Sequence, residues 1–178
     1  MARIFSAIDI EDEETLEKLK HIRDKLDLEF NPIETGKMHI TLQFFKDLNE
    51  EEIKEVKKGL ENIDTQPFTA KISELGTLPS EDYIRVIWAG IEHPKIYEIQ
   101  EKASKHDVES NDEHEFKPHI TLLRVENTSK KEKKKVQKTI DQYRSTEIGE
   151  IEVDKVKLFK SELTPNGAEY TQIAEKKL

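Results

Sequence analysis

The apolar residues of this chain fall either into short runs that alternate with polar residues or into longer segments with helical spacing. Alternation with period two predicts strands, and apolar residues three or four positions apart predict helices. The strands expected on this basis are 3–9, 38–45, 68–75, 83–91, the segment after Pro118, 148–159 and 168–174. The expected helices are 11–28, 94–106, 129–143 and one that runs through Leu60 from an Asn49 N-cap.

Three segments carry the polar and turn-forming residues of connections. Residues 76–82 and 107–117 are expected to be irregular. The stretch Thr-Pro-Asn-Gly at 164–167 is a strong turn signal between two β-prone segments, so the last two strands are expected to form a hairpin.

The tetrapeptide His-Ile-Thr-Leu occurs twice, at residues 39–42 and 119–122. Each copy occupies an equivalent place, because each half of the chain runs strand, helix, His-Ile-Thr strand, helix, strand. We therefore expect an internal duplication with halves of roughly 1–78 and 79–178 and a pseudo-twofold axis. No linker rich in Gly, Ser or Pro separates the halves. We expect residues 1–178 to form one bilobal α+β domain, with two antiparallel or mixed sheets facing a central cleft and helices on the outer faces.

Each copy of the tetrapeptide combines a titratable ring with a hydroxyl group. Side chains alternate between the two faces of a strand, so His39 and Thr41 would share one face. The same holds for His119 and Thr121. The aliphatic residues of each copy would anchor the opposite face in the core. Two such strands side by side would bring two imidazoles and two hydroxyls to one ligand.

The charge of the chain limits how it can bind nucleic acid. Charged residues make up 38% of the chain and the formal net charge is −9. A protein that tracks a long nucleic-acid backbone usually carries a basic stripe, which this balance argues against. A concave pocket for one phosphate or one RNA end needs only a few local donors and stays compatible. The Lys-rich run 130–135 is interrupted by Glu132, and we interpret it as a solvated helix face.

The chain contains no cysteine, which excludes disulfides, thiol catalysis and thiolate metal sites. No apolar stretch is long enough to span a membrane, and the N-terminus lacks the pattern of a signal peptide. We expect a cytoplasmic monomer that does not bind membranes.

Two histidines in one site suit proton transfer around a phosphate. Histidine titrates near neutral pH, so a pair can hold one neutral and one protonated ring. The neutral ring can take a proton from water and the protonated ring can give one to a leaving oxygen. The threonine hydroxyls can bind phosphate oxygens between them. This set suits in-line displacement at phosphorus, and opening a cyclic phosphate in this way needs no metal or other cofactor.

A zinc site is the less favoured interpretation of the same residues. Neither half contains His-x-x-x-His, and a His/Thr pair is a poor zinc ligand set. The remaining histidines, His21, His93, His106 and His114, lie in polar or surface-like sequence. A three-histidine metal site drawn from them is an open alternative that their spacing does not favour.

The motifs around the two copies extend the pattern to nearly the whole chain. The N-terminal strand reads Arg-Ile-Phe-Ser-Ala-Ile-Asp at residues 3–9, and the two copies read Lys-Met-His-Ile-Thr-Leu-Gln-Phe at 37–44 and Phe-Lys-Pro-His-Ile-Thr-Leu-Leu-Arg at 116–124. The C-terminal segment 158–170 contains Ser-Glu-Leu-Thr-Pro-Asn-Gly. With these segments the chain resembles the two-histidine (2H) phosphoesterase superfamily, and within it the RNA 2′,3′-cyclic phosphodiesterases, long labelled 2′-5′ RNA ligases.

The resemblance implies a reaction and a role for each motif residue. It implies metal-free hydrolysis of a 2′,3′-cyclic phosphate, on an RNA 3′ end or a nucleotide, to a 2′-phosphomonoester. By position, His119 would be the base that activates water and His39 the acid that protonates the departing O3′. Thr41 and Thr121 would hold the phosphate.

Three further residues match family positions that contact substrate. Arg124 matches an arginine near the phosphate, although strict alternation puts it on the face opposite His119 unless a bulge or strand end intervenes. Phe5 and Phe44 match aromatic positions where base stacking is suggested. Because Phe44 is in phase with Ile40, core packing is the favoured interpretation for it, and both interpretations stay open for Phe5.

Two classes of function follow. The first is a phosphodiesterase, whose site would also run in reverse as 2′-5′ RNA ligation. Other cyclic nucleotides and ADP-ribose cyclic phosphate are rival substrates. The second class is a non-catalytic module that recognises the phosphate of an RNA end or nucleotide.

Overall fold

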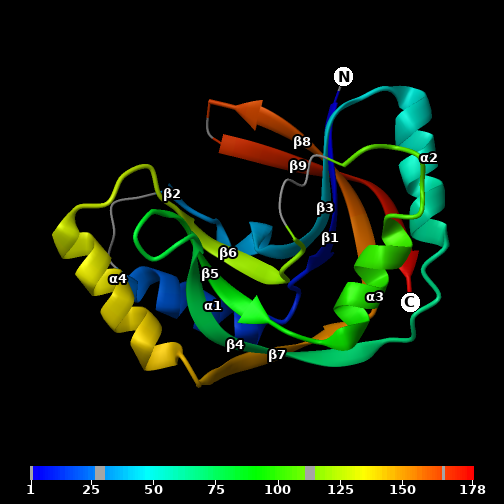
Figure 1. Cartoon of the computed structure of the whole chain (residues 1–178). Coiled ribbons are helices and arrows are strands. Elements are labelled where there is room, and N and C mark those ends of the chain that lie inside the picture. The colour runs from blue at the N-terminus through cyan, green and yellow to red at the C-terminus, as the bar shows by residue number, and fades with distance from the viewer. Residues whose placement is uncertain (1, 27–30, 111–114, 166) are drawn as a thin grey trace.

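The computed structural model describes residues 2–26, 31–110, 115–165 and 167–178. The strands are β1 (Ala2–Asp9), β2 (Asn31–Pro32), β3 (His39–Leu48), β4 (Phe68–Pro79), β5 (Ile84–Ile91), β6 (His119–Arg124), β7 (Glu147–Val153), β8 (Lys155–Thr164) and β9 (Gly167–Lys177). The α-helices are α1 (Glu13–Leu26), α2 (Glu50–Glu61), α3 (Pro94–Ala103) and α4 (Lys130–Tyr143), and a short 3₁₀ helix, η1, covers Thr35–Lys37. Figure 1 shows their arrangement.

The strands form one sheet in the order β7-β4-β5-β6-β3-β1-β8-β9, with β2 beside β6. Every strand pair in the described ranges is antiparallel. The α+β class expected from the sequence is confirmed. The two expected sheets are joined into one, because β3 and β6 pair at the centre through Ile40 and Ile120. On one side of this junction lie β3, β1, β8 and β9, and on the other lie β6, β5, β4 and β7. Each side thus begins with one of the two His-Ile-Thr strands.

The two halves of the sheet are not the two halves of the sequence. β4 comes from the first half of the chain but lies beside β5. β8 and β9 come from the second half, but β8 lies beside β1 and β9 beside β8. The single strand expected over 148–159 is therefore wrong: β7 ends at Val153 on one flank of the sheet, and β8 starts at Lys155 on the other. The expected loop 76–82 is also shorter, because β4 continues to Pro79 by pairing with β5. The β8–β9 hairpin is confirmed.

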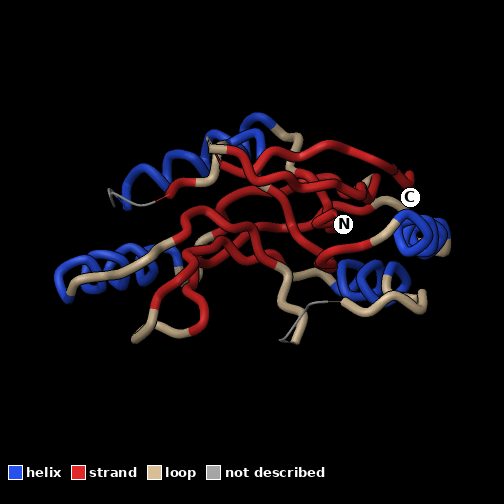
Figure 2. Tube along the Cα trace, turned by 90° about the horizontal axis from the view of Figure 1, so that it is seen from above, coloured by secondary structure: helices blue, strands red, loops and turns tan. Residues whose placement is uncertain are grey.

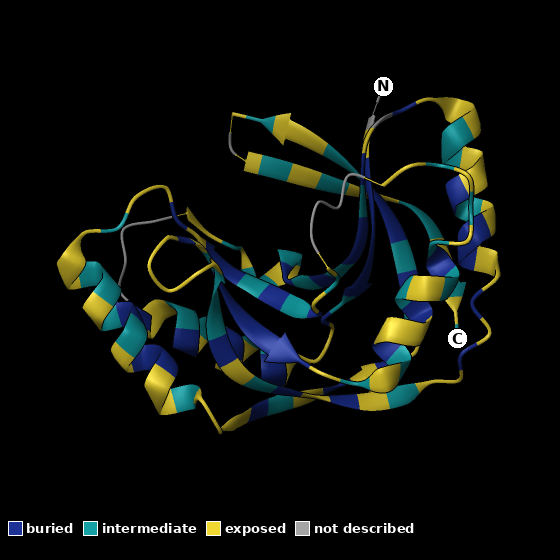
Figure 3. Cartoon of the chain, in the orientation of Figure 1, coloured by how far each residue is buried: buried dark blue, intermediate teal, exposed yellow. Residues whose placement is uncertain are grey.

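The helices pack in two pairs against the sheet. α1 and α4 contact each other and the β4, β6 and β7 side, whereas α2 and α3 contact each other and the β3 and β9 side; the two pairs lie at opposite ends of the molecule in Figures 1 and 2. The apolar stripes of all four helices join the aliphatic strand residues in one continuous core. Figure 3 shows buried helix faces turned inward and exposed faces outward. Burying these stripes, at about 25 cal/mol per Å² of apolar surface, drives the assembly.

Local sequence signals set the helix ends. Asn49 caps α2 as expected, accepting from the backbone amides of Glu51 and Glu52. Pro94 opens α3, which ends at Ala103, earlier than expected. The last residues of the expected helix 11–28 and His114 lie outside the described residues. No helix in the described parts of the chain is long and apolar enough to cross a membrane.

Candidate active site

Both motif histidines are oriented by the backbone two residues before them. His39 Nδ1 lies 2.8 Å from the carbonyl oxygen of Lys37, and His119 Nδ1 lies 2.7 Å from that of Lys117. A carbonyl can only accept, so each Nδ1 carries the proton and donates it. Nε2 is then the atom that accepts a proton when the ring is neutral and donates it when the ring is protonated.

The central strand pair brings the two tetrapeptides together. Ile40 pairs with Ile120 across the β3–β6 junction. Because the strands are antiparallel, Thr41 lies next to His119 and Thr121 next to His39 on the face opposite the two isoleucines. His39 Nε2 also lies 3.1 Å from Thr41 Oγ1. The two imidazoles and two hydroxyls therefore form one alternating array.

A β-bulge interrupts each tetrapeptide at its leucine. On β3, Thr41 pairs with Ala7 and the next pair is Gln43–Ser6, so Leu42 is skipped. On β6, Leu122 is skipped in the same way against β5. The extra residue shifts the alternation by one position in both strands. The residue five positions after each histidine therefore returns to the histidine face.

The bulges settle the faces of two predicted site residues. On β5, Val86 pairs with Arg124 and Trp88 pairs with Thr121. Val86 and Trp88 are two residues apart and share a face, so Arg124 and Thr121 do too. Arg124 is thus on the histidine face and is exposed. Phe44 is its counterpart: it pairs with Phe5, two residues before Ala7, which pairs with Thr41. The expected phase of Phe44 with Ile40 is wrong, because it assumed unbroken alternation, but Phe44 does pack against buried apolar residues, those of the cluster of Phe5 and Phe159.

Aromatic rings surround His39. Phe5 stacks on the imidazole with ring centroids 4.9 Å apart, and Tyr170 approaches the imidazole edge-on at 5.7 Å. Phe159 stacks in turn on Phe5, with ring centroids 5.2 Å apart. Phe5 is only 3% exposed, and these rings with Ala7 form a small apolar cluster, separate from the main core, against which Phe44 also packs. Phe5 therefore supports the imidazole with its ring face.

The surroundings of His119 contain one large ring. Trp88 lies with its ring centroid 6.2 Å from the imidazole, and Lys117 Nζ lies 4.3 Å from the Trp88 centroid as a cation–π partner. The indole lies over Gly76, where a Cβ would come within 2.2 Å of Trp88 Cζ2. Glycine at this position is thus required for the indole to lie flat on β4.

Burial and neighbouring charges set the proton affinity of both rings. Desolvation is the largest effect and lowers the pKa of His39 and of His119 below the usual value, because burial penalises the charged form. The positive charge of Arg124, which lies on the same face, lowers both pKa values further. A site that holds two half-buried imidazoles and a guanidinium on one face is suited to an anion.

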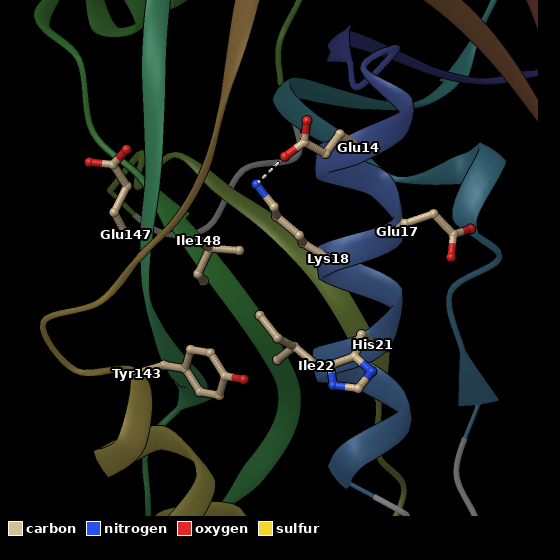
Figure 4. A pocket seen from close by; sticks show the side chains of 8 residues that line it. All are labelled: Glu14, Glu17, Lys18, His21, Ile22, Tyr143, Glu147 and Ile148. Atoms are coloured by element: carbon tan, nitrogen blue, oxygen red, sulfur yellow. Dashed lines mark ion pairs between the residues drawn. The ribbon is translucent and has the colours of Figure 1, made fainter.

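His93, His106 and His21 have structural or surface positions. His93 caps α3, accepting from the Lys95 amide, and stacks on Phe68. His106 Nε2 lies 3.3 Å from Gln43 Oε1 on the helix side of the sheet. His21 lines a surface hollow between α1 and the end of α4, shown in Figure 4 with Tyr143 and the Glu14–Lys18 ion pair. Within the described ranges, no three His, Asp or Glu residues gather in a way that would hold a metal ion.

Comparison with known proteins agrees with this geometry. The family model described as LigT like Phosphoesterase matches residues 8–88 and again 92–170, once for each His-Ile-Thr-Leu. The chain belongs to the LigT-like phosphoesterase family. The family resemblance and the enzyme class inferred from the motifs are thereby confirmed.

Individual relatives match over almost their whole length. A protein of Methanocaldococcus jannaschii named RNA 2′,3′-cyclic phosphodiesterase is 35% identical over 97% of this chain and 99% of its own. The crystal structure of TT0787 of Thermus thermophilus has the same fold, with a TM-score of 0.79, 24% identity and coverage of 99% of this chain and 97% of that one. E. coli LigT complexed with 3′-AMP also shares the fold, with a TM-score of 0.71, 23% identity and coverage of 99% and 97%.

Sequence reasoning missed several residues of the site. Trp88, Phe159 and Tyr170 come from strands that only the sheet places beside the motifs. One signal was available: a lysine precedes each histidine by two positions, and it is the carbonyl of that lysine that orients each ring.

Proposed function

We propose that this family member hydrolyses the 2′,3′-cyclic phosphate of RNA 3′ ends or nucleotides to a 2′-phosphomonoester. The proposal rests on the two imidazoles that share one face of the sheet. Each ring donates its Nδ1 proton to a backbone carbonyl, so each Nε2 is available for proton transfer. The relatives named RNA 2′,3′-cyclic phosphodiesterase support the substrate class.

In the proposed reaction His119 is the base. Its neutral Nε2 takes a proton from a water molecule while the water oxygen attacks phosphorus in line with the P–O3′ bond. The lowered pKa of His119 favours the neutral ring that this step needs.

His39 is the acid. Its protonated Nε2 donates to O3′ as the P–O3′ bond breaks, so the phosphate stays on O2′ and O3′ leaves as a hydroxyl. The negative phosphate raises the proton affinity of a nearby imidazole, which offsets the desolvation that lowers the pKa of His39 in the free protein. Proton exchange with solvent then resets both rings. Ligation would use the same site and the same two rings: a 5′-hydroxyl in place of water gives its proton to His119 and attacks phosphorus, O3′ leaves with the proton of His39, and a 2′-5′ linkage forms.

The phosphate is held by Thr41, Thr121 and Arg124. The hydroxyls alternate with the imidazoles, and the guanidinium lies on the same face through the Leu122 bulge. Arginine binds phosphate oxygens through two parallel N–H donors, which fixes the orientation needed for in-line attack. Phe44 offers a partly buried apolar ring on this face for the nucleobase.

The test is a panel of 2′,3′-cyclic and 3′,5′-cyclic phosphates, offered with a chelator present, with the product monoester identified by NMR. We expect turnover of the 2′,3′-cyclic substrates to 2′-phosphates. Activity that chelator abolishes and zinc or magnesium restores would refute the metal-free mechanism. A 3′-phosphate product would refute O3′ as the leaving group, and tight binding without turnover would favour the non-catalytic alternative.

A further inference from the structure

The pseudo-twofold symmetry of the site is broken beside the histidines. Asp9 pairs with His39 across β1 and β3, whereas Gly90 occupies the matching place opposite His119 on β5. Residues directly opposite in an antiparallel pair share a face, with Cβ atoms about 5 Å apart. A carboxylate thus accompanies one imidazole, whereas the residue paired with the other has no side chain of its own, and Glu74 Cγ and Trp88 Cζ3 lie 3.0 Å from where its Cβ would stand.

The Asp9 carboxylate is held in place by a partly buried lysine. Lys157 Nζ lies 2.9 Å from Asp9 Oδ2 and 2.8 Å from Glu11 Oε1. The side chain of Lys157 is 12% exposed and that of Asp9 27%, so solvent screens this pair less than a surface pair. Glu11 in turn binds Lys155 at 2.7 Å. The carboxylate is therefore fixed beside the imidazole.

We propose, on the basis of the function above, that Asp9 is the positioning residue that makes His39, and not His119, the proton donor of the site. A fixed negative charge favours the imidazolium form of the ring next to it. The counterpart of Asp9 is a glycine, and the charges that act most on His119, from Arg124 and Lys117, are both positive and lower its pKa. Asp9 acts on His39 in the opposite direction, since its charge raises the pKa of that ring.

Among the described residues that act on His39 across the sheet, Asp9 carries the negative charge. The titratable and charged neighbours of His39, element by element, are Asp9 on β1, Arg124 and His119 on β6, Tyr170 on β9, Lys157 on β8 and Lys37 just before β3. The Nζ atom of Lys37 lies 2.9 Å from Glu34 Oε1. Removing the Asp9 charge would leave positive neighbours around His39. Both rings would then favour the neutral form, and the acid would be lost first as the pH rises.

The experiment is an NMR titration of the histidine rings in Asp9→Asn, combined with the pH dependence of turnover. Asn keeps the shape of Asp and removes the charge. We expect the pKa of His39 to fall by about one unit while that of His119 stays unchanged. The alkaline limb of the rate profile, which reports the acid, should move to lower pH by a similar amount, and the acidic limb should stay in place.

Two variants of the same ion cluster complete the design. Glu11→Gln removes the other carboxylate that binds Lys157 and should leave both limbs unchanged. Lys157→Met removes the positive charge behind Asp9 and should raise the pKa of His39, the opposite sign to Asp9→Asn.

An unchanged His39 titration in a folded Asp9→Asn protein would overturn the proposal, and so would a shift of the acidic limb in place of the alkaline one. A parent protein that turns over no cyclic phosphate would refute the proposed function instead. In that case the NMR titration would still decide whether Asp9 sets the protonation of His39.

Discussion

The two copies of His-Ile-Thr-Leu share one backbone design but differ in what surrounds their histidines. Each imidazole donates to the carbonyl two residues earlier, and each strand bulges at its leucine. Around His39 lie Phe5, Tyr170 and the Asp9 carboxylate; around His119 lie Trp88 and two cationic side chains. The comparison teaches that the backbone presents the two imidazoles in the same way, whereas the neighbouring side chains set a carboxylate beside one ring and cationic groups near the other, the difference on which the proposed division of tasks rests.

Loss of either imidazole is expected to have the largest effect. His39→Ala and His119→Ala should each lower turnover of a 2′,3′-cyclic nucleotide by roughly 10²–10⁴-fold, because each removes a positioned acid or base. His21→Ala, on the outer side of α1, is the matched control and should keep the parent rate. Steady-state kinetics on variants shown to be folded by circular dichroism would check this, and near-parent rates for both alanine variants would refute the assignment.

A substrate that needs no acid separates the two roles. In a cyclic phosphate with sulfur at the 3′ position the thiolate leaves without a proton. His39→Ala should then approach the parent rate, while His119→Ala should stay impaired because water still needs a base. Recovery of His119→Ala instead would exchange the two roles.

The equivalent residues Arg124 and Phe44 are expected to differ in importance for the chemical step. Arg124→Gln removes charged hydrogen bonds to phosphate, each worth about 1.5–3 kcal/mol, and should lower kcat/KM by about 10–100-fold. Thr41→Ala and Thr121→Ala should each lower kcat/KM by no more than the loss of one such hydrogen bond. Phe44→Leu, which keeps an apolar side chain on the same face, should change KM more than kcat. Equal losses of kcat for Arg124→Gln and Phe44→Leu would contradict this division.

A smaller effect, on stability, tests the Trp88 side of the site. Gly76→Ala places a Cβ within 2.2 Å of the indole, which must move, so we expect a loss of about 1–3 kcal/mol in the free energy of unfolding. Gly36→Ala is the control, because nothing lies within 4 Å of its Cβ position, and its effect should be within about 0.5 kcal/mol. Urea unfolding of both proteins gives the comparison. A Gly76→Ala protein as stable as the parent would show that the indole is not held against β4.

The smallest expected change is a shift in the titration of the two rings on binding inorganic phosphate. In the free protein both His39 and His119 should titrate below the usual value, since burial lowers both pKa values. A bound phosphate favours the imidazolium form, so both pKa values should rise. NMR titration with and without phosphate measures the shift, and His106, whose ring lies against Gln43 on the helix side of the sheet, is the control. Unchanged values for the motif histidines would place the phosphate elsewhere.

The sequence by itself determined the local features of this protein. Period-two alternation located the strands, the Asn49 cap located the start of α2, and the repeated tetrapeptide singled out the two histidines and two threonines. These features depend on residues close together in the chain, where spacing alone decides which side chains share a face.

Only the tertiary structure decided the rest. Strict alternation put Phe44 in phase with Ile40 and Arg124 on the face opposite His119. Both side chains lie on the histidine face because of bulges that form in the pairing with β1 and β5. The break of 148–159 at Asp154 likewise reflects which partners each strand finds in the sheet. The contacts of Tyr170 with His39, of Trp88 with His119 and of Lys157 with Asp9 likewise join residues that are far apart in the sequence. Strand pairing and register are non-local, so the pattern of a single strand does not contain them.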